Sequence, residues 1–289
     1  MKTDLTFILV LLKARKEMER KMKSVIFLSI LILVLVSGCV QKAPIEHGHT
    51  HTHGASVKHH SDNVLNCVAE SGHHVYAEEM ECPIGGENFT SLILGTHSTY
   101  GRHLDWEPVS YMRFPTPIPV CPGNGLVVTE REYSNDKLEK LKLLVESKEY
   151  KELYKQQHAT YFLYAKTLEL TGAKSSDQWW LYLNATWEAD NCGNKELYKQ
   201  YAGLAISEAK IKLVDLTPDE ENYWVLSIII ANMYRRIGSF DKAEEYFNTL
   251  GEPELDNSDS NEFFLLAKKL LGNAIVNKEI GRVKIKGED

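Results

Sequence analysis

The chain has 289 residues, of which 43% are hydrophobic and 25% are charged. This balance is typical of a folded globular protein and excludes an intrinsically disordered chain. With 33 Lys and Arg against 40 Asp and Glu, the formal net charge is −7, which argues against a nucleic-acid partner because phosphate binding depends on clustered basic residues.

Residues 1–39 have the layout of a signal peptide. Met22-Lys23 provides a basic start, residues 25–36 form a mainly apolar run, and Val36-Ser37-Gly38-Cys39 provides a small-residue cleavage signature. The run is shorter than the roughly 20 residues of a membrane-spanning helix, and the cysteine after small residues resembles the lipobox of prokaryotic lipoproteins. We therefore expect translation from Met22, lipidation at Cys39 and a membrane-anchored protein on the extracytoplasmic face. A simple secretion signal or an uncleaved anchor would give the same compartment.

Residues 40–66 are expected to form a flexible tether rich in histidine, since eight of the eleven histidines fall between His47 and His74. Neutral imidazoles on a flexible chain can gather around Zn²⁺, Ni²⁺ or Cu²⁺. The alternative is a solvated spacer that binds metal only incidentally. The tether histidines in question are His47, His49, His51, His53, His59 and His60.

Residues 67–132 are predicted to form a small cysteine-containing module. Short apolar segments such as 89–94 and 125–129 lie between Gly and Pro residues, a pattern that indicates short strands between turns. Outside the cytoplasm, the four cysteines that remain after Cys39 can form disulfides in three connectivities, and the spacing does not choose among them. These four are Cys67, Cys82, Cys121 and Cys192.

Residues 133–289 are predicted to form an array of antiparallel helices, because apolar residues recur with helical period in this part of the chain. The resulting fold class is α+β, mainly α. The clearest helical segments are 161–170, 179–187, 198–213 and 223–237, followed by a short helix after Ser239.

One helix pair carries the spacing of a tetratricopeptide repeat. Ala231 and Ala243 would let two helices approach closely, Gly238 would turn the chain, and Tyr234 and Phe247 would pack across the seam. The repeat favours a short helical domain that binds a protein or peptide partner. For the aromatic residues of these helices, core packing and a concave binding groove are alternative explanations: Trp179, Trp180, Tyr182, Trp187, Tyr223 and Trp224.

Two Cys-Pro turns, the first knuckle (residues 82–86) and the second knuckle (residues 121–125), bracket the middle of the module. Zinc knuckles are built on Cys-Pro-x-Cys-Gly pairs that supply four thiolates. Here Gly85 and Asn124 occupy the places of the second cysteines. Two thiolates alone do not make a structural zinc site.

The chain resembles an uncharacterised prokaryotic family, a domain of unknown function, in which paired Cys-Pro-x-Cys knuckles precede tetratricopeptide-like helices. The resemblance covers residues 82–250 and implies architecture and a metal-binding or interaction role, without an assigned activity. Besides the repeat positions, it depends on Cys82-Pro83, Gly86, Phe89, Gly101, Leu104-Asp105, Cys121-Pro122 and Gly125.

The resemblance, combined with export, suggests that a disulfide between Cys82 and Cys121 replaces the metal. A disulfide that closes a loop of about 40 residues stabilises by roughly 3 to 4 kcal/mol. The alternatives are a retained metal that recruits His97, His103 or a tether histidine, and free thiols. No cofactor is required, although Zn²⁺ or Ni²⁺ would suit the alternative.

An enzymatic function is not expected. His97, His103 and Asp105 are close in sequence and are residue types used in acid–base or metal hydrolytic work, but the chain carries no Gly-x-Ser-x-Gly, His-Glu-x-x-His or phosphate-loop motif. Asp105 is expected to cap a turn. We expect a non-enzymatic lipoprotein that binds a protein or peptide; the competing hypothesis is a protein that handles Zn, Ni or Cu.

Overall fold

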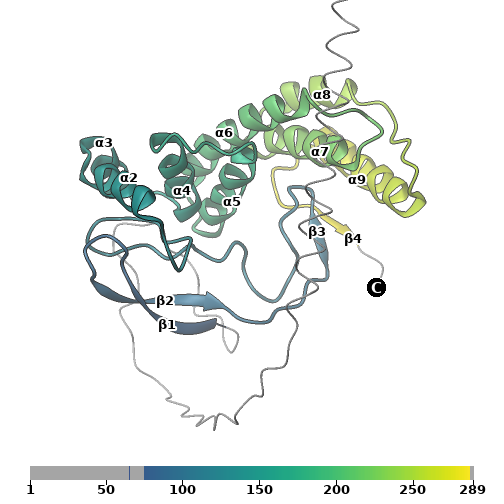
Figure 1. Cartoon of the computed structure of the whole chain (residues 1–289). Helices are drawn as coiled ribbons and strands as arrows, with labels where there is room; N and C mark the ends of the chain where they lie inside the picture. Colours follow the sequence, from purple (N-terminus) through teal and green to yellow (C-terminus); the bar gives the residue numbers. More distant parts are fainter. Residues whose placement is uncertain (1–64, 66–74, 287–289) are drawn as a thin grey trace, which may run out of the picture. The chain divides into compact units, whose positions relative to one another are not determined.

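The computed structural model describes residues 65 and 75–286, which belong to one compact unit. The described residues form eight helices and two two-stranded antiparallel sheets (Figure 1). This arrangement confirms the predicted fold class, α+β and mainly α. The predicted signal peptide and most of the predicted tether lie outside the described residues.

The first sheet is a hairpin of strands β1 (Val75–Glu81) and β2 (Asn88–Leu94), connected through the first knuckle. Strand β2 confirms the strand predicted at residues 89–94. The strand predicted at residues 125–129 is reduced to a single bridge between Val120 and Val127. The second knuckle lies between these two residues, so the turn occupies the chain that a longer ladder would need.

The second sheet joins distant parts of the chain, because β3 (Gly101–His103) pairs with β4 (Lys284–Lys286). Figure 1 shows the two short strands side by side. Sequence periodicity assigned these segments to different domains, 67–132 and 133–289. Strands of three residues carry too little pattern for their pairing to be predicted.

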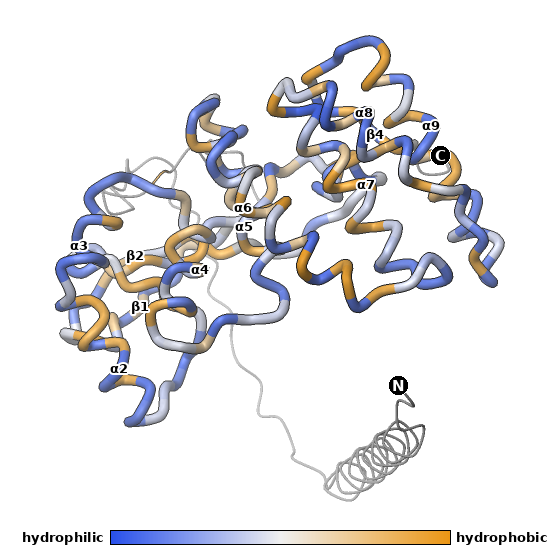
Figure 2. The backbone as a smooth tube through the Cα atoms, turned by 90° about the horizontal axis from the view of Figure 1, so that it is seen from above, coloured by the Kyte–Doolittle hydropathy of each residue, from blue (hydrophilic) through white to orange (hydrophobic). Residues whose placement is uncertain are grey.

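The helices follow one another with short connections, and most match the segments expected from helical period. Figure 2 shows hydrophobic and hydrophilic residues interspersed along them, as expected for helices that each bury one face. The eight helices are α2 (Asn135–Glu146), α3 (Lys148–Lys155), α4 (Thr160–Leu170), α5 (Gln178–Asn191), α6 (Lys195–Leu213), α7 (Glu221–Arg236), α8 (Phe240–Asn248) and α9 (Ser258–Val276).

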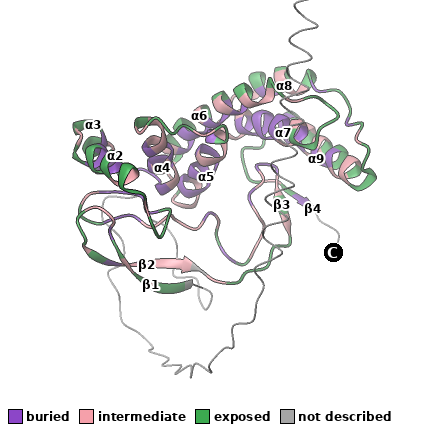
Figure 3. Ribbon diagram, viewed as in Figure 1, coloured by how far each residue is buried: buried purple, intermediate pink, exposed green. Residues whose placement is uncertain are grey.

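Two of the core clusters share α7, which is buried along most of its length (Figure 3). Two smaller clusters pack the knuckles against α2, α3 and α4. One cluster packs α4, α5, α6 and α7 together and includes the buried Tyr182 and Trp187. Another packs α7, α8 and α9 with Leu104 and Ile285, so the second sheet is part of the helical core. Tyr182, Trp187 and Trp224 are at most 2% exposed, which favours core packing for these three aromatic residues.

Candidate functional site

The two knuckles have the same backbone geometry. In the first, Cys82 N donates to Glu87 O at 2.8 Å and Gly86 N donates to Cys82 O at 3.1 Å. In the second, Cys121 N donates to Leu126 O at 2.8 Å and Gly125 N donates to Cys121 O at 2.9 Å. The repeated Cys-Pro signal in the sequence therefore corresponds to a repeated turn, which presents the two sulfur atoms to each other.

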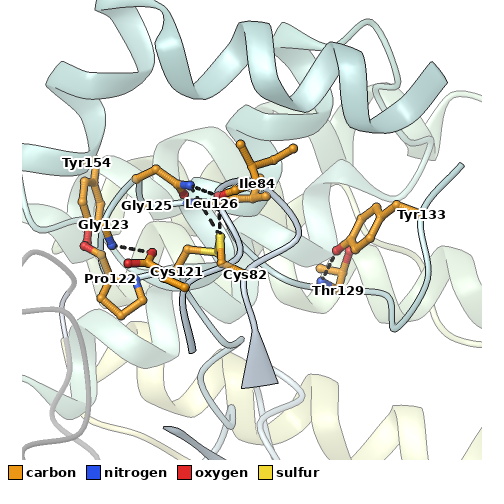
Figure 4. The surroundings of a disulfide bond; sticks show 12 residues. Cys82, Ile84, Cys121, Pro122, Gly123, Gly125, Leu126, Thr129, Tyr133 and Tyr154 are labelled. Atoms are coloured by element: carbon orange, nitrogen blue, oxygen red, sulfur yellow. Dashed lines mark hydrogen bonds between the residues drawn. A yellow bond between two sulfur atoms is a disulfide. The ribbon is translucent and has the colours of Figure 1, made fainter. Parts of the chain in front are cut away.

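The Cys82 and Cys121 sulfur atoms are 2.15 Å apart, and the two Cα atoms are 5.6 Å apart, which is disulfide geometry (Figure 4). Both cysteines are buried. The potential metal ligands around the two sulfurs include Glu87 and, within the described chain, no histidine. The structure therefore does not bring His97 or His103 to this pair.

Asn124 stands where a Cys-Pro-x-Cys turn would have its second cysteine, and it connects the two knuckles by a hydrogen bond. Its Nδ2 donates to the carbonyl oxygen of Ile84 in the first knuckle at 2.7 Å, and its Oδ1 accepts from Leu126 N at 2.9 Å. Glu87 makes a reciprocal connection, since its Oε1 accepts from Gly123 N at 2.8 Å. These bonds hold the turns in register around the disulfide.

Helix α3 supports the second knuckle from its outer side. Tyr154 donates its hydroxyl to Pro122 O at 2.7 Å, and its ring lies directly against Gly125, which has a φ of +78°. Tyr150 donates its hydroxyl to Gly125 O at 3.0 Å. Only glycine permits both this backbone conformation and this close approach of the ring.

A cleft of about 310 Å³ lies between α2, α4 and the segment that follows the second knuckle; we call it the α2–α4 cleft. Its walls are largely apolar, whereas charged residues of α2 are also part of its lining. Tyr133, in this lining, receives hydrogen bonds on its hydroxyl from Thr129 N at 2.9 Å and from Glu130 N at 3.1 Å. The main apolar residues are Val127, Leu141, Tyr164 and Leu168, and the charged ones are Asp136, Lys137 and Lys140.

A second group of functional residue types surrounds the end of β3. Asp105 and Glu107 are 1% and 2% exposed, and Asp105 Oδ2 pairs with Arg236 Nη1 at 3.1 Å. Glu107 Oε1 pairs with Arg282 Nη1 at 3.1 Å. Asp190, at the end of α5, accepts from both arginines, at 2.9 Å from Arg236 Nη2 and 2.7 Å from Arg282 Nε. We call these residues, together with His103, the acid–arginine cluster.

Burial shifts the pKa values of two members of this cluster, Glu107 and His103. It raises the pKa of Glu107 to about 8, against the opposing effect of Arg282. It also lowers the pKa of His103. The pKa of Asp190 is lowered, because the two arginines outweigh the effect of its burial. Glu107 and His103 are thus both shifted toward their neutral forms.

The structure places the predicted lipidation site, the candidate histidines and Asp105 in different surroundings. Cys39 and the tether histidines lie outside the described residues. His97 is exposed and packs its ring against Phe114, with centroids 5.1 Å apart, whereas His103 belongs to the acid–arginine cluster. Asp105 accepts from Glu107 N at 3.4 Å within its turn.

The five repeat positions lie along the α7–α8 connection. Ala231 and Ala243 are fully buried, and Tyr234 and Phe247 are partly buried. Gly238 has a φ of +79° between the two helices. These positions are compatible with the proposed packing roles, and the assignment to the tetratricopeptide class stays a prediction.

Sequence reasoning missed Glu107, Asp190, Arg236 and Arg282 as members of a site. Glu107 could have been found from the spacing His103-x-Asp105-x-Glu107, which places three ligand-type side chains within one turn. The other three come from α5, α7 and the segment before β4, and no local pattern connects them.

No family model, curated protein or solved structure matches this chain. None of the described helices combines the length and the apolar content needed to cross a bilayer.

Proposed function

We propose that this chain is a non-enzymatic, extracytoplasmic lipoprotein that binds a protein or peptide segment in the α2–α4 cleft. The observation that carries the proposal is the cleft itself, an apolar hollow beside the disulfide-linked knuckles. Its volume is at the lower end of the range of about 300–1,000 Å³ found for ligand pockets, which suits a short segment. The lipid anchor at Cys39 rests on the signal peptide pattern of residues 1–39.

The chemistry of the cleft favours an apolar side chain followed by an acidic group. Leu141, Tyr164 and Leu168 offer apolar surface, while Lys137 and Lys140 outweigh the single acid, Asp136. Lys137 is already paired with Glu130 at 2.5 Å. Lys140 is exposed, so its ammonium group is available to a ligand carboxylate.

One wall of the cleft is expected to be rigid before a ligand binds. Val127 and Thr129 follow the second knuckle, whose position is fixed by the disulfide and by Tyr150 and Tyr154 of α3. A preformed wall reduces the conformational entropy lost on binding. The module would thus serve the helices by holding a binding surface in shape.

The test is a selection of displayed random peptides on the purified chain, followed by affinity measurements on variants. We expect the selected peptides to combine an apolar residue with a nearby Asp or Glu. Leu168→Asp should weaken their binding at least tenfold, because it places a carboxylate in the apolar wall. Leu170→Asp is the matched control, since Leu170 is on the same helix, is 39% exposed and lies outside the cleft lining.

The charge preference has its own pair of variants. Lys140→Glu should weaken the binding of acidic peptides by up to about fivefold, as expected for the loss of an exposed ion pair. Lys142→Glu, also exposed on α2 but outside the lining, should leave affinity unchanged. Peptides that bind the Leu168→Asp variant as tightly as the unaltered chain would overturn the proposal.

A second candidate function is metal handling, which is favoured by the histidine-rich sequence between His47 and His74. Calorimetric titration with Zn²⁺, Ni²⁺ and Cu²⁺, with and without residues 40–62, separates the two functions. Micromolar or tighter binding that disappears on truncation would support metal handling by the tether. Peptide binding that persists without metal would support the cleft.

A further inference from the structure

The turn after β3 gathers three potential metal ligands. His103 N donates to Glu107 O at 2.9 Å, and Trp106 N donates to His103 O at 2.9 Å, so the chain reverses within five residues. Trp106 adopts a φ of +65° to make this reversal. The ligand atoms of His103, Asp105 and Glu107 all lie within 4.8 Å of one another.

Two of these ligand atoms are buried without a hydrogen-bond partner. His103 Nδ1 and Glu107 Oε2 are 3.8 Å apart, which is too long for a hydrogen bond. Most buried polar atoms in native structures have a partner, so two adjacent exceptions call for an explanation. Glu107 is 2% exposed, and its unpaired oxygen faces the imidazole.

The distance of 3.8 Å suits two ligands of one metal ion. Nitrogen and oxygen ligands lie about 2.1 Å from a first-row divalent ion such as Zn²⁺, which places two ligands about 3.4 Å apart in a tetrahedral site and about 4.2 Å apart when they are opposite. The pair falls between these limits.

The arginines orient the carboxylates without occupying the inner oxygens. Asp105 uses Oδ2 for Arg236, and Glu107 uses Oε1 for Arg282. Glu107 Oε2 then has no hydrogen-bond partner, and Asp105 Oδ1 accepts a hydrogen bond of 3.4 Å from Glu107 N. Such outer partners commonly fix the direction of metal ligands.

Arg235 opposes cation binding, since its guanidinium lies near the cluster and donates to Asn232 Oδ1 at 2.7 Å and to Gly281 O at 2.9 Å. Its positive charge adds to those of Arg236 and Arg282 beside the carboxylates. We therefore expect affinity in the micromolar range and not the nanomolar range.

We propose that His103 Nδ1, an inner oxygen of Asp105 and Glu107 Oε2 bind one divalent first-row transition-metal ion. One imidazole nitrogen and two carboxylate oxygens suit Zn²⁺ and Mn²⁺, and Zn²⁺ should bind more tightly. The ion would strengthen the connection of the β3 turn to α7 and the segment before β4. This site is independent of the α2–α4 cleft and of the tether.

The test uses the full chain in detergent with the eight histidines between His47 and His74 replaced by Asn, which removes the tether ligands. Titration with ZnCl₂ should show one bound equivalent of Zn²⁺ with a micromolar Kd, and titration with MnCl₂ should show weaker binding of Mn²⁺. Glu107→Gln and His103→Gln should each weaken the binding of Zn²⁺ at least 100-fold. His97→Gln is the matched control and should change nothing, because His97 is exposed and outside the cluster.

Melting curves provide a second readout. One equivalent of Zn²⁺ should raise the melting temperature of the tether-substituted chain and leave that of its His103→Gln variant unchanged. His103 is partly exposed, so this variant should fold even if Glu107→Gln does not. The proposal is overturned if the chain binds no metal at 1 mM, a concentration about a thousandfold above a micromolar Kd, or if the His103→Gln variant binds Zn²⁺ with unchanged affinity. Metal handling by the tether would remain testable in the unsubstituted chain.

Discussion

The segment that precedes the helices packs on them at two junctions, and different chemistry holds each junction together. At the disulfide junction, Cys82 and Cys121 form a covalent link, and Asn124 and Glu87 hydrogen-bond across the two knuckles. At the acid–arginine cluster, the β3 turn is held by ion pairs to Arg236 and Arg282. The first junction packs on α2, α3 and α4, the second on α5, α7 and the segment before β4.

The junctions also differ in how completely their polar groups are paired. None of the buried side-chain atoms without a partner in the described chain lies in the knuckles, whereas three of them lie in the acid–arginine cluster. In the knuckles, the sulfur atoms are bonded to each other and the buried polar side-chain atoms have partners, so these groups are not free to bind a ligand. Buried polar atoms without a partner, in contrast, can still bind an ion or a proton.

The largest effect is expected from Arg236→Met, which tests the ionic junction. The arginine pairs with Asp105, which is 1% exposed, and with Asp190. Removal of one partner of a buried pair costs about 3 to 5 kcal/mol, and we expect the upper end because two carboxylates lose a contact. Urea unfolding measures this change in the free energy of unfolding.

The double variant Arg236→Met with Asp105→Asn is its control. It removes the uncompensated charge and should recover part of the lost stability. If the free energy of unfolding of Arg236→Met is within about 1 kcal/mol of that of the unaltered chain, the buried ion pair does not stabilise this junction appreciably.

The covalent junction is tested by replacing both Cys82 and Cys121 with serine. The sequence separation of 39 predicts a loss of about 4 kcal/mol from the greater freedom of the unfolded chain. Unfolding should be measured without reductant, because Cys192 is also disulfide-bonded and must stay oxidised in both proteins. A loss below about 1 kcal/mol would mean that the hydrogen bonds alone hold the knuckles together.

Local patterns predicted much of what the disulfide junction contains. The paired Cys-Pro turns, the strand at residues 88–94 and the helices that follow all leave a periodic or turn signal in the sequence. The resemblance pointed to Cys82 and Cys121, which the structure brings to disulfide distance. The strand expected at residues 125–129 is shorter because the tight turn of the second knuckle leaves only one bridge.

The acid–arginine cluster was largely beyond the reach of sequence analysis. Asp105 and Arg236 are 131 residues apart, and Arg236 has no feature in the sequence that separates it from a surface arginine. The pairing of β3 with β4, which sets the turn beside Arg282, involves three residues on each strand. Only tertiary packing brings these groups together, so neither spacing nor composition could reveal them.

A smaller effect is expected at Gly125, where the disulfide junction meets α3. A Cβ atom on Gly125 would lie 2.4 Å from Tyr154 Cγ, so Gly125→Ala must displace the ring and weaken its bond to Pro122. We expect a loss of about 3 kcal/mol, from a strained φ and from overpacking. Gly238→Ala is a matched control, because its φ of +79° is nearly the same and nothing lies within 4 Å of the added atom.

The control should lose only about 1 kcal/mol, from the backbone conformation alone. The difference between the two alanine variants therefore isolates the steric contact with Tyr154. Equal losses in thermal or urea unfolding would contradict a rigid contact between the second knuckle and α3.

The smallest effect is expected for Asn124→Ala, which removes one hydrogen bond between the knuckles and one within the second knuckle and leaves the disulfide in place. The bonds to Ile84 O and Leu126 N should together contribute about 1 to 2 kcal/mol, because this side chain is only partly buried.

The same substitution in the Cys82→Ser, Cys121→Ser background completes a double-mutant cycle. If the disulfide positions Asn124, the alanine change should cost less in that background, and the coupling free energy measures how far the staple and the hydrogen bonds act together. If Asn124→Ala lowers the free energy of unfolding equally in both backgrounds, the two turns keep their relative position without the covalent bond. The disulfide would then stabilise the junction without positioning Asn124.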